Sequence, residues 1–431
     1  MTDAAAKTAL HTDHYELTML EGALRSGAAD RSCVFEVFAR RLPEGRRYGV
    51  AAGTGRLLEA LQRFRFDDGE LADLSERRVV DRPTLDWLAG YRFGGDVRGY
   101  GEGECYVPGS PILEVRGSFA EAVLLETLVL SVLNHDSAIA AAASRMVTAA
   151  GERPCIEMGT RRTHEESAVA AARAAYLAGF ASTSNLEAGR RHGIPTAGTS
   201  AHAFTLVHDS ERAAFAAQVA ALGTGTTLLV DTYDIAEGVR LAVEAAGPGL
   251  GAVRIDSGDL VVQARAVREQ LDGLGATRTR IVVTSDLDEH AIAALAAAPV
   301  DAYGVGTSVV TGSGASTAGL VYKLVEVDGR PVGKTSVGKP GRGGRKWALR
   351  RRGPDGTAVA EVLRVGRAPV DDGDDRALQV PLIERGQVVG AEPLAEARDR
   401  HQRSLDELPA TAVRLQRGEP AIPTVFEEGW P

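Results

Sequence analysis

Residues 227–259 read TLLVDTYDIAEGVRLAVEAAGPGLGAVRIDSGD, and this stretch decides the fold class of the 431-residue chain. Two short apolar runs, at 227–230 and 252–255, flank an Ala-rich segment with the spacing of an amphipathic helix. Each run is followed by a polar turn. Alternation of short strands with helices is typical of βα units, whose strands pair in parallel. We therefore expect a parallel α/β sheet around this stretch.

The same βα period extends on both sides of this stretch. Further apolar runs lie at 154–158, 177–180 (a weak one), 194–198, 281–283 and 300–303. Helical patterns lie at 165–177, 183–192, 210–222, 234–246, 259–273 and 288–298, with Ser182, Ser210, Asp234 and Asp288 as expected N-caps. So many strands in so short a stretch predict an irregular parallel α/β barrel, closed or nearly closed. An open doubly wound sheet is the alternative, because strand order cannot be read from sequence.

The segments that flank this period have a different character. Residues 1–135 mix short helices with strand-like pieces and end in an apolar helix that we expect to pack on the barrel. Residues 321–431 open with a hairpin around Asp328-Gly329 and add short strands and a polar helix near 394–407. We expect these two segments to form one second α+β domain, beside a barrel domain of residues 136–320.

The composition excludes several classes of protein. Hydrophobic residues at 44% and charged residues at 25% indicate a soluble globular chain, and the net charge of −9 argues against a nucleic-acid binder or an anionic-membrane binder. The three cysteines, Cys33, Cys105 and Cys155, are too widely spaced for a disulfide framework or a zinc site. The apolar run 120–133 contains two glutamates, so we expect a buried helix and no membrane span. We expect a cytoplasmic protein.

Lysine is rare and unevenly distributed. There are only five lysines, and none lies between residues 8 and 322. This excludes Schiff-base and P-loop lysine chemistry from the predicted barrel, so anion recognition there must fall to arginines and backbone amides. Lys323, Lys334, Lys339 and Lys346 lie together just after the barrel segment. Our hypothesis is a mobile basic hairpin and loop that closes over ATP or pyrophosphate, with a chance surface cluster as the alternative.

Polar residues follow the predicted strands, where barrel enzymes place their active sites. Gly304, Gly306 and Thr307 come after the last strand and suit a phosphate, since glycine lets backbone N–H groups approach closely. Asp256 can hold ribose hydroxyls or a metal, and Arg254, which points inward from a strand, needs an anion. An Asp or Ser at such a place is also the usual N-cap of the next helix. The joint occurrence of these groups at the strand ends indicates a site.

A histidine and two arginines complete this candidate site. His202 lies among small residues, which leave room for a ligand, and Asp231 at the next strand end can orient its ring. A nucleophilic or acid–base role for His202 competes with a structural one. Arg161 and Arg162 form a second cationic clamp, and the pattern leaves open which of them meets the substrate.

Taken together, these strings resemble the nicotinate phosphoribosyltransferases. The resemblance rests on residues 12–19 (TDHYELTM), 35–38, 121–134, 159–204, 256–259 and 322–324. It implies a type II phosphoribosyltransferase barrel and a homodimer with shared active sites. The implied reaction converts nicotinate, phosphoribosyl pyrophosphate and ATP, with Mg²⁺, to nicotinate mononucleotide, pyrophosphate, ADP and phosphate, through a phosphohistidine, in NAD salvage. The alternatives are a nicotinamide phosphoribosyltransferase and a phosphate-binding barrel lyase.

The resemblance also implies a role for each candidate residue. His202 is the residue that ATP phosphorylates, and Asp231 orients it. The other implied roles are contact with the nicotinate carboxylate and the sugar phosphate or pyrophosphate (Arg161 or Arg162, and Arg254), ribose binding (Asp256), and binding of the 5-phosphate (Ser285, Asp286, Gly304, Gly306 and Thr307). Tyr15 of the partner subunit stacks on the pyridine ring; its alternative is a first-turn residue of a helix capped by Asp13-x-x-Glu16. Ser184 stands where nicotinamide-using relatives carry Asp. Its neutral hydroxyl suits an anionic base better than a carboxylate would. No ligands to Mg²⁺ are assigned.

Overall fold

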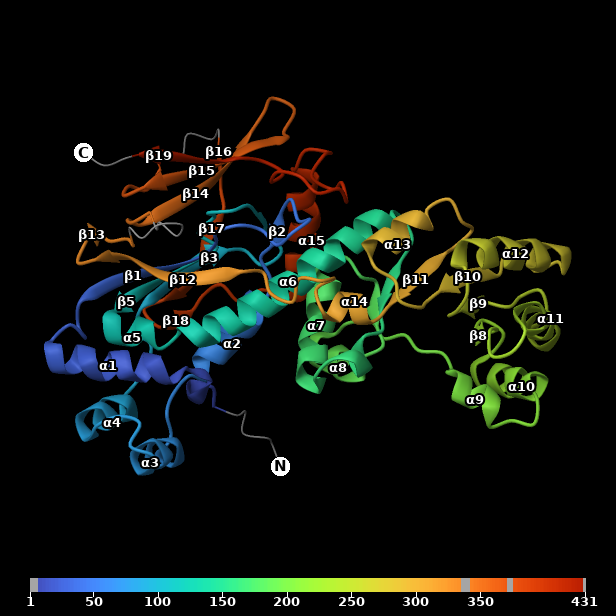
Figure 1. Cartoon of the computed structure of the whole chain (residues 1–431), viewed down its shortest axis with the longest axis horizontal. Coiled ribbons are helices and arrows are strands. Elements are labelled where there is room, and N and C mark those ends of the chain that lie inside the picture. The colour runs from blue at the N-terminus through green and yellow to red at the C-terminus, as the bar shows by residue number, and fades with distance from the viewer. Residues whose placement is uncertain (1–6, 335–341, 370–374, 429–431) are drawn as a thin grey trace. The chain divides into compact units, whose positions relative to one another are not determined.

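The computed structural model of the chain describes residues 7–334, 342–369 and 375–428. The chain forms two compact units: Met1–Ala138 with Thr317–Pro431, which we call the sheet unit, and Ile139–Ser316, which we call the barrel unit. Figure 1 shows the green-to-amber βα repeats of the barrel unit and the strands of the sheet unit, drawn from both ends of the sequence.

The barrel unit is built on a curled parallel sheet in the order β7-β6-β11-β10-β9-β8. Its strands are β6 (Cys155–Glu157), β7 (Ser182–Thr183), β8 (Thr227–Leu229), β9 (Ala252–Ile255), β10 (Arg280–Val283) and β11 (Ala302–Val305). Thr196 adds a single parallel bridge to Thr183. The last strand, β11, pairs with the first, β6, which gives the cyclic order of a barrel, with an opening between Thr196 and β8. The predicted irregular parallel α/β barrel is confirmed.

Helices follow these strands nearly as the sequence predicts. They are α7 (Glu165–Leu177), α8 (Leu186–His192), α9 (His202–Leu206), α10 (Glu211–Leu222), α11 (Ile235–Ala246), α12 (Leu260–Gly273), α13 (Glu289–Ala294) and α14 (Thr307–Val310), with the 3₁₀ turn η2 (Thr160–Arg162). Ser210, Asp234 and Asp288 are N-caps whose side chains accept backbone N–H groups. The predictions of a strand at 177–180 and of an N-cap at Ser182 are wrong. Helix α7 extends to Leu177, the strand is Ser182–Thr183, and Asn185 is the cap of α8.

The sheet unit contains an antiparallel seven-stranded sheet and a separate four-stranded sheet in which β15 and β19 pair in parallel. The first has the order β13-β12-β1-β5-β3-β17-β18 and the second β16-β14-β15-β19. The strands are β1 (Ser32–Ala39), β3 (Asp96–Tyr100), β5 (Leu113–Ser118), β12 (Leu320–Val327), β13 (Arg330–Pro331), β14 (Lys346–Arg352), β15 (Ala358–Val365), β16 (Asp375–Ala377), β17 (Gln379–Glu384), β18 (Gln387–Val388) and β19 (Thr424–Glu428), besides the pair β2 (Gly49–Val50) and β4 (Cys105–Tyr106). The predicted hairpin forms at Asp328-Gly329, where both φ angles are positive, as a type I′ turn requires. Its second strand ends at Pro331, and residues 335–337 lie outside the described residues.

Helices accompany these sheets. They are α1 (His14–Ser26), α2 (Thr54–Gln62), α3 (Asp68–Glu76), α4 (Arg82–Ala89), α5 (Phe119–Val123) and α15 (Leu394–Asp406), with the 3₁₀ turn η1 (Ala9–His11). Helix α6 (Glu126–Ala150) begins in the sheet unit and ends in the barrel unit. The segment Phe119–Ala150 is long and apolar enough to cross a membrane by length and composition, but 67% of its most apolar window is buried. Such burial is what a core helix of a folded unit shows.

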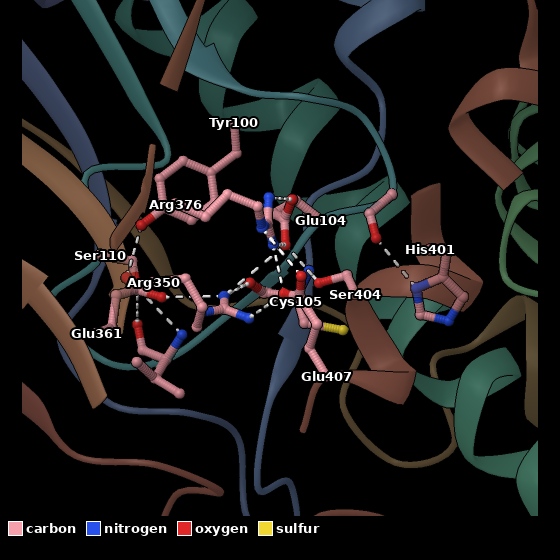
Figure 2. Close-up of polar contacts among 12 residues, drawn as sticks. Tyr100, Glu104, Cys105, Ser110, Arg350, Glu361, Arg376, His401, Ser404 and Glu407 are labelled. Carbon is pink, nitrogen blue, oxygen red and sulfur yellow. Dashed lines mark hydrogen bonds and ion pairs between the residues drawn. The ribbon is translucent and has the colours of Figure 1, made fainter. Parts of the chain in front are cut away.

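A buried network of charges joins the two sheets of the sheet unit (Figure 2). Arg350 on β14 is fully buried, contacts Glu361 on β15 at 3.3 Å and donates to the carbonyl of Cys105 at 2.7 Å. Tyr100 on β3 donates to Glu361 at 2.6 Å. Burial alone would raise the pKa of Glu104, but hydrogen bonds from Arg376 and the charge of Arg350 hold it below its ordinary value. Arg350 and Arg376 each pair with glutamates of the network, which indicates a structural role.

His401 provides a test of this buried polar region. It lies on α15, is buried, and its Nδ1 contacts Gly103 O at 3.1 Å. Burial lowers the pKa of His401 to about 4. Below pH 6.5 the histidine takes up a proton in the unfolded chain but not in the folded protein. The contribution of His401 to the free energy of unfolding is therefore complete above pH 6.5 and is lost as the pH falls toward 4, by about 3 kcal/mol at most.

We therefore expect His401→Asn to lose less free energy of unfolding than the wild type between pH 6.5 and pH 4, measured by urea denaturation at a series of pH values. His164→Asn is the matched control, because His164 is exposed. It should keep the wild-type dependence on pH. Equal dependence in the wild type and His401→Asn would contradict the account.

Candidate active site

The carboxylate of Asp231 joins three segments at the carboxyl ends of the barrel strands. Asp231 follows β8 and is 9% exposed. Its Oδ1 lies 3.2 Å from Nε2 of His202, the first residue of α9. Its Oδ2 accepts the backbone N–H of Asp256 and the hydroxyl of Ser257, each at 2.8 Å. The structure thus brings His202, Asp231 and Asp256 together, as one site would require.

The contact with Asp231 sets the protonation pattern of the His202 ring. A carboxylate only accepts hydrogen bonds, so the nitrogen that faces it, Nε2, carries the proton in the neutral ring. Nδ1 then holds the lone pair. The side chain of His202 is 41% exposed, whereas that of Asp231 is 1% exposed. A buried carboxylate behind a solvent-accessible imidazole is suited to nucleophilic or acid–base chemistry.

Arg254 on β9 is a half-buried cation with an unused donor. Its Nη1 donates to Thr199 Oγ1 at 2.8 Å, but its buried Nε has no hydrogen-bond partner. Burial lowers the pKa of Arg254, the nearby carboxylates Asp256 and Asp231 oppose this, and the charge of Arg161 lowers it further. Arg254 and Arg161 are therefore close enough to repel each other. Two guanidinium groups held in this way are suited to binding an anion.

The side chains of Arg161 and Arg162 lie in η2, after β6, and both are exposed. Within the described part of the chain neither forms an ion pair. The charge of Arg161, rather than that of Arg162, contributes to the lowered pKa of Arg254. Ser184 follows β7, and its side chain is exposed.

Asp256 is positioned by a hydroxyl that the sequence analysis does not single out. Thr284, at the end of β10, donates to Asp256 Oδ1 at 2.5 Å. Ser257 and Thr199 hold Asp231 and Arg254 in the same way. All three are small hydroxyl residues beside predicted site residues, and this proximity is the only signal for them in the sequence. The Asp256 carboxylate is therefore fixed at the mouth of the barrel, where it can bind hydroxyl groups or a cation.

The residues expected to bind phosphate have different environments. Ser285 and Asp286 are exposed in the loop after β10, and Ser285 has φ 102°. A non-glycine residue in this conformation costs about 1–3 kcal/mol, and such residues cluster at functional sites. Gly304 is buried in β11, where a Cβ would lie 2.5 Å from Thr284 Cγ2. Packing therefore requires a glycine at position 304. After the strand, Gly306 is half-buried and Thr307 is exposed.

Tyr15 belongs to the sheet unit, on α1, and is 45% exposed. The capping box proposed for this helix does not form, because the Asp13 side chain makes no capping hydrogen bond. Glu16 is fully buried instead and accepts the N–H and the hydroxyl of Thr127 at 2.9 and 2.6 Å. Burial, followed by the charges of Glu126 and Glu16, raises the pKa of Tyr15, which keeps its hydroxyl protonated.

The hypothesis of a basic closing loop is wrong for one of its lysines. Lys346 is buried and pairs with Glu36 at 2.9 Å, so it is a core residue of the sheet unit. Lys339 lies outside the described residues. Lys323 and Lys334 line a pocket of about 460 Å³ in the sheet unit, together with Arg40 and Arg342.

A His–Asp pair and two arginines at the carboxyl ends of curled parallel strands define an α/β-barrel enzyme. The signature of the nicotinate phosphoribosyltransferase (NAPRTase) N-terminal domain matches residues 10–134. A nicotinate phosphoribosyltransferase, pncB1, of Mycobacterium tuberculosis (strain CDC 1551 / Oshkosh) is 63% identical over 426 residues, covering 96% of this chain and 94% of that protein. The nicotinate phosphoribosyltransferase of Bacillus subtilis (strain 168) is 38% identical over 334 residues, covering 75% and 68%.

Solved structures agree with the sequence relatives. The crystal structure of human nicotinic acid phosphoribosyltransferase matches with a TM-score of 0.83 and 28% identity, over 96% of this chain and 97% of that one. The chain belongs to the nicotinate phosphoribosyltransferase family. This excludes the alternative of a phosphate-binding barrel lyase.

The protonation of His202 can be tested without substrate. We expect the ¹⁵N shifts of the neutral His202 ring to report a proton on Nε2. In Asp231→Asn, we expect the amide oxygen to occupy the position of Oδ2, because the N–H of Asp256 and the hydroxyl of Ser257 both donate there. The amide NH₂ then faces Nε2 of His202. The proton should move to Nδ1. Ser210→Ala, at a nearby helix cap, is the control and should leave the shifts unchanged. A proton on Nδ1 in the wild type would rule out the assigned geometry.

Proposed function

We propose that the protein is an ATP-coupled enzyme that converts nicotinate and phosphoribosyl pyrophosphate to nicotinate mononucleotide and pyrophosphate, with ATP converted to ADP and phosphate. The observation that carries the coupling is the His202–Asp231 pair in a chain of this family. An imidazole with an accessible lone pair and a buried carboxylate behind it is equipped to receive a phosphoryl group. The product would enter NAD salvage.

In the first step, the Nδ1 lone pair of His202 attacks the γ-phosphorus of ATP. The bond from that phosphorus to the bridging oxygen breaks, and its electron pair leaves on ADP. After the ribosyl transfer, water attacks the phosphorus of the phosphohistidine, the electron pair of the P–N bond returns to Nδ1, and phosphate leaves. The phosphorylated ring is a cation when Nε2 keeps its proton, and Asp231, 3.2 Å away, stabilises that charge. The backbone of Asp256 and the hydroxyl of Ser257 hold the carboxylate so that it does not need to reorganise.

In the transfer step, the ring nitrogen of nicotinate bonds to C1 of the ribose while the bond to pyrophosphate breaks. Positive charge develops at C1, and the arginines stabilise the anions around it. The unpaired donor of Arg254 suits the nicotinate carboxylate, a sugar phosphate or the pyrophosphate, and Asp256 suits the ribose hydroxyls. The cations Arg161 and Arg254 and the neutral Ser184 suit a base that carries a carboxylate, which supports nicotinate over nicotinamide as substrate.

Mg²⁺ would supply charge that stabilises the departing pyrophosphate. Among the described residues no group of three or more His, Cys, Asp or Glu side chains could hold a metal ion. Mg²⁺ commonly binds through one or two carboxylates together with substrate phosphates and water. The residues present fit that mode, with Asp256 as the carboxylate, and not a preformed metal cage.

The second subunit completes the proposal. A homodimer in which Tyr15 of one chain stacks on the pyridine bound by the other would use an exposed aromatic ring. Lys323 and Lys334 would offer positive charge to a polyphosphate. A cytoplasmic location is the expectation from cysteine usage, and in the structure all three cysteines are free and buried.

The proposed role of His202 predicts a sharp loss of function. With nicotinate, phosphoribosyl pyrophosphate, ATP and Mg²⁺, we expect the wild type to form nicotinate mononucleotide and to take up label from γ-labelled ATP, and nicotinamide to be a poor substrate. His202→Ala should lose both the label and the stimulation by ATP, because it removes the ring that contacts Asp231, while its melting temperature changes little. His208→Ala, two residues beyond the end of α9, is the control and should stay active. Wild-type turnover with ATP in His202→Ala would overturn the role, and preference for nicotinamide would overturn the substrate.

A shared active site can be tested by mixing two inactive variants. Tyr15→Ala lacks the stacking ring, and His202→Ala lacks the nucleophile. In a mixed dimer one barrel has its own His202 and the partner's Tyr15, so an equal mixture after subunit exchange should regain about a quarter of wild-type activity. Mixing Tyr15→Ala with Asp231→Ala should do the same. No recovery in a sample shown to contain mixed dimers would contradict a shared site.

A further inference from the structure

Glu157 is a buried carboxylate that the proposed mechanism does not use. It is the last residue of β6 and is 1% exposed. Its Oε1 accepts the backbone N–H of Gly159, and its Oε2 accepts the hydroxyl of Thr183 at 2.5 Å. Gly159 opens the loop that carries Arg161, and Thr183 ends β7. The carboxylate of Glu157 therefore links the loop after β6 to the end of β7.

The contact continues through Thr183 to Asn185. The Thr183 hydroxyl donates to Glu157 and accepts the backbone N–H of Asn185 at 2.9 Å. The Asn185 side chain returns to the first loop, where its Nδ2 donates to Thr160 Oγ1 at 3.2 Å. Its Oδ1 accepts the N–H of Ala188 and so caps α8. These three side chains form a closed circuit between the two loops, which we call the Glu157–Thr183–Asn185 brace.

The brace is built to position and not to bind. All three side chains are buried, with exposed fractions of 1%, 1% and 5% for Glu157, Thr183 and Asn185. Every polar atom of these side chains already forms a hydrogen bond. Burial raises the pKa of Glu157, and the hydrogen bonds from Thr183 and Gly159 oppose that rise. Buried polar groups that satisfy one another fully make a local structure rigid, and losing one partner leaves the others with a desolvation cost.

The brace adjoins Arg161, one of the arginines expected to meet the nicotinate carboxylate, and Ser184, which we relate to the choice of base. Arg161 directly follows Thr160, and Ser184 lies between Thr183 and Asn185. The backbone N–H of Ser184 also donates to the carbonyl of Glu157 at 2.8 Å. We propose that Glu157, Thr183 and Asn185 are positioning residues that hold Arg161 and Ser184 at the spacing that the pyridine base requires, and so determine its affinity. This inference rests on the proposed function.

Thr183→Val tests the brace, because valine keeps the shape of threonine and removes the hydroxyl. We expect the KM for nicotinate to rise about tenfold, the effect of losing one buried hydrogen bond, while the KM for phosphoribosyl pyrophosphate stays within about twofold. Thr279→Val is the matched control. Thr279 is also 1% exposed and hydrogen-bonded, to Leu250 O at 2.9 Å, but it precedes β10 at the opposite end of the strands. It should lower thermal stability without changing either KM.

Two further variants separate positioning from folding. Thr183→Ser restores the hydroxyl and should return the nicotinate KM to near the wild-type value. Thr160→Val changes an exposed residue, so the fold should survive, and removes only the acceptor for Asn185; its nicotinate KM should rise as well. A parallel rise of both KM values in Thr183→Val, or an equal nicotinate effect in Thr279→Val, would overturn the brace. A wild type that makes no nicotinate mononucleotide would instead refute the proposed function.

Discussion

The carboxylate of Asp231 is the contact on which the rest of the candidate site depends. One of its oxygens meets His202, and the other receives the backbone of Asp256 and the hydroxyl of Ser257. A buried carboxylate without such donors would carry a large desolvation cost. Its partners come from two other segments, one with His202 and one with Asp256 and Ser257, so the contact forms only when the sheet curls and brings these segments together. The contacts that the proposed chemistry needs therefore form only in the folded barrel.

The two units treat buried positive charge differently. In the sheet unit, Arg350 pairs with Glu361, and Lys346 pairs with Glu36, so each cation is compensated within the fold. In the barrel unit, Arg254 pairs with no carboxylate in the described part of the chain and is repelled by Arg161. A guanidinium remains charged under these conditions, whereas a lysine would lose its proton more readily. The absence of lysine from the barrel segment fits a site that must stay cationic until an anion arrives.

Much of the fold could be predicted because each element carries its own local signal. The helix of residues 210–222 has an apolar face and a serine cap, and the structure places it at Glu211–Leu222 behind Ser210. The errors fall where that signal is weak. Strand β7 is two polar residues that pair through their backbone, and α9 has only five residues, so neither produces a periodic pattern. Lys346 was misjudged for a different reason: only the folded sheet places Glu36, 310 positions away, beside it.

The sequence by itself determined the βα period, the restriction of barrel cations to arginine, and the set of polar residues at the strand ends. These are local properties, written in composition and spacing. Only the tertiary structure decided which ring nitrogen of His202 faces Asp231, that Thr284 holds Asp256, and that Glu157 links two loops through Thr183 and Asn185. Those contacts join residues on different strands, and their distances depend on how far the sheet curls. Spacing along the chain predicts that the sheet curls, but it does not give the distances between side chains on different strands.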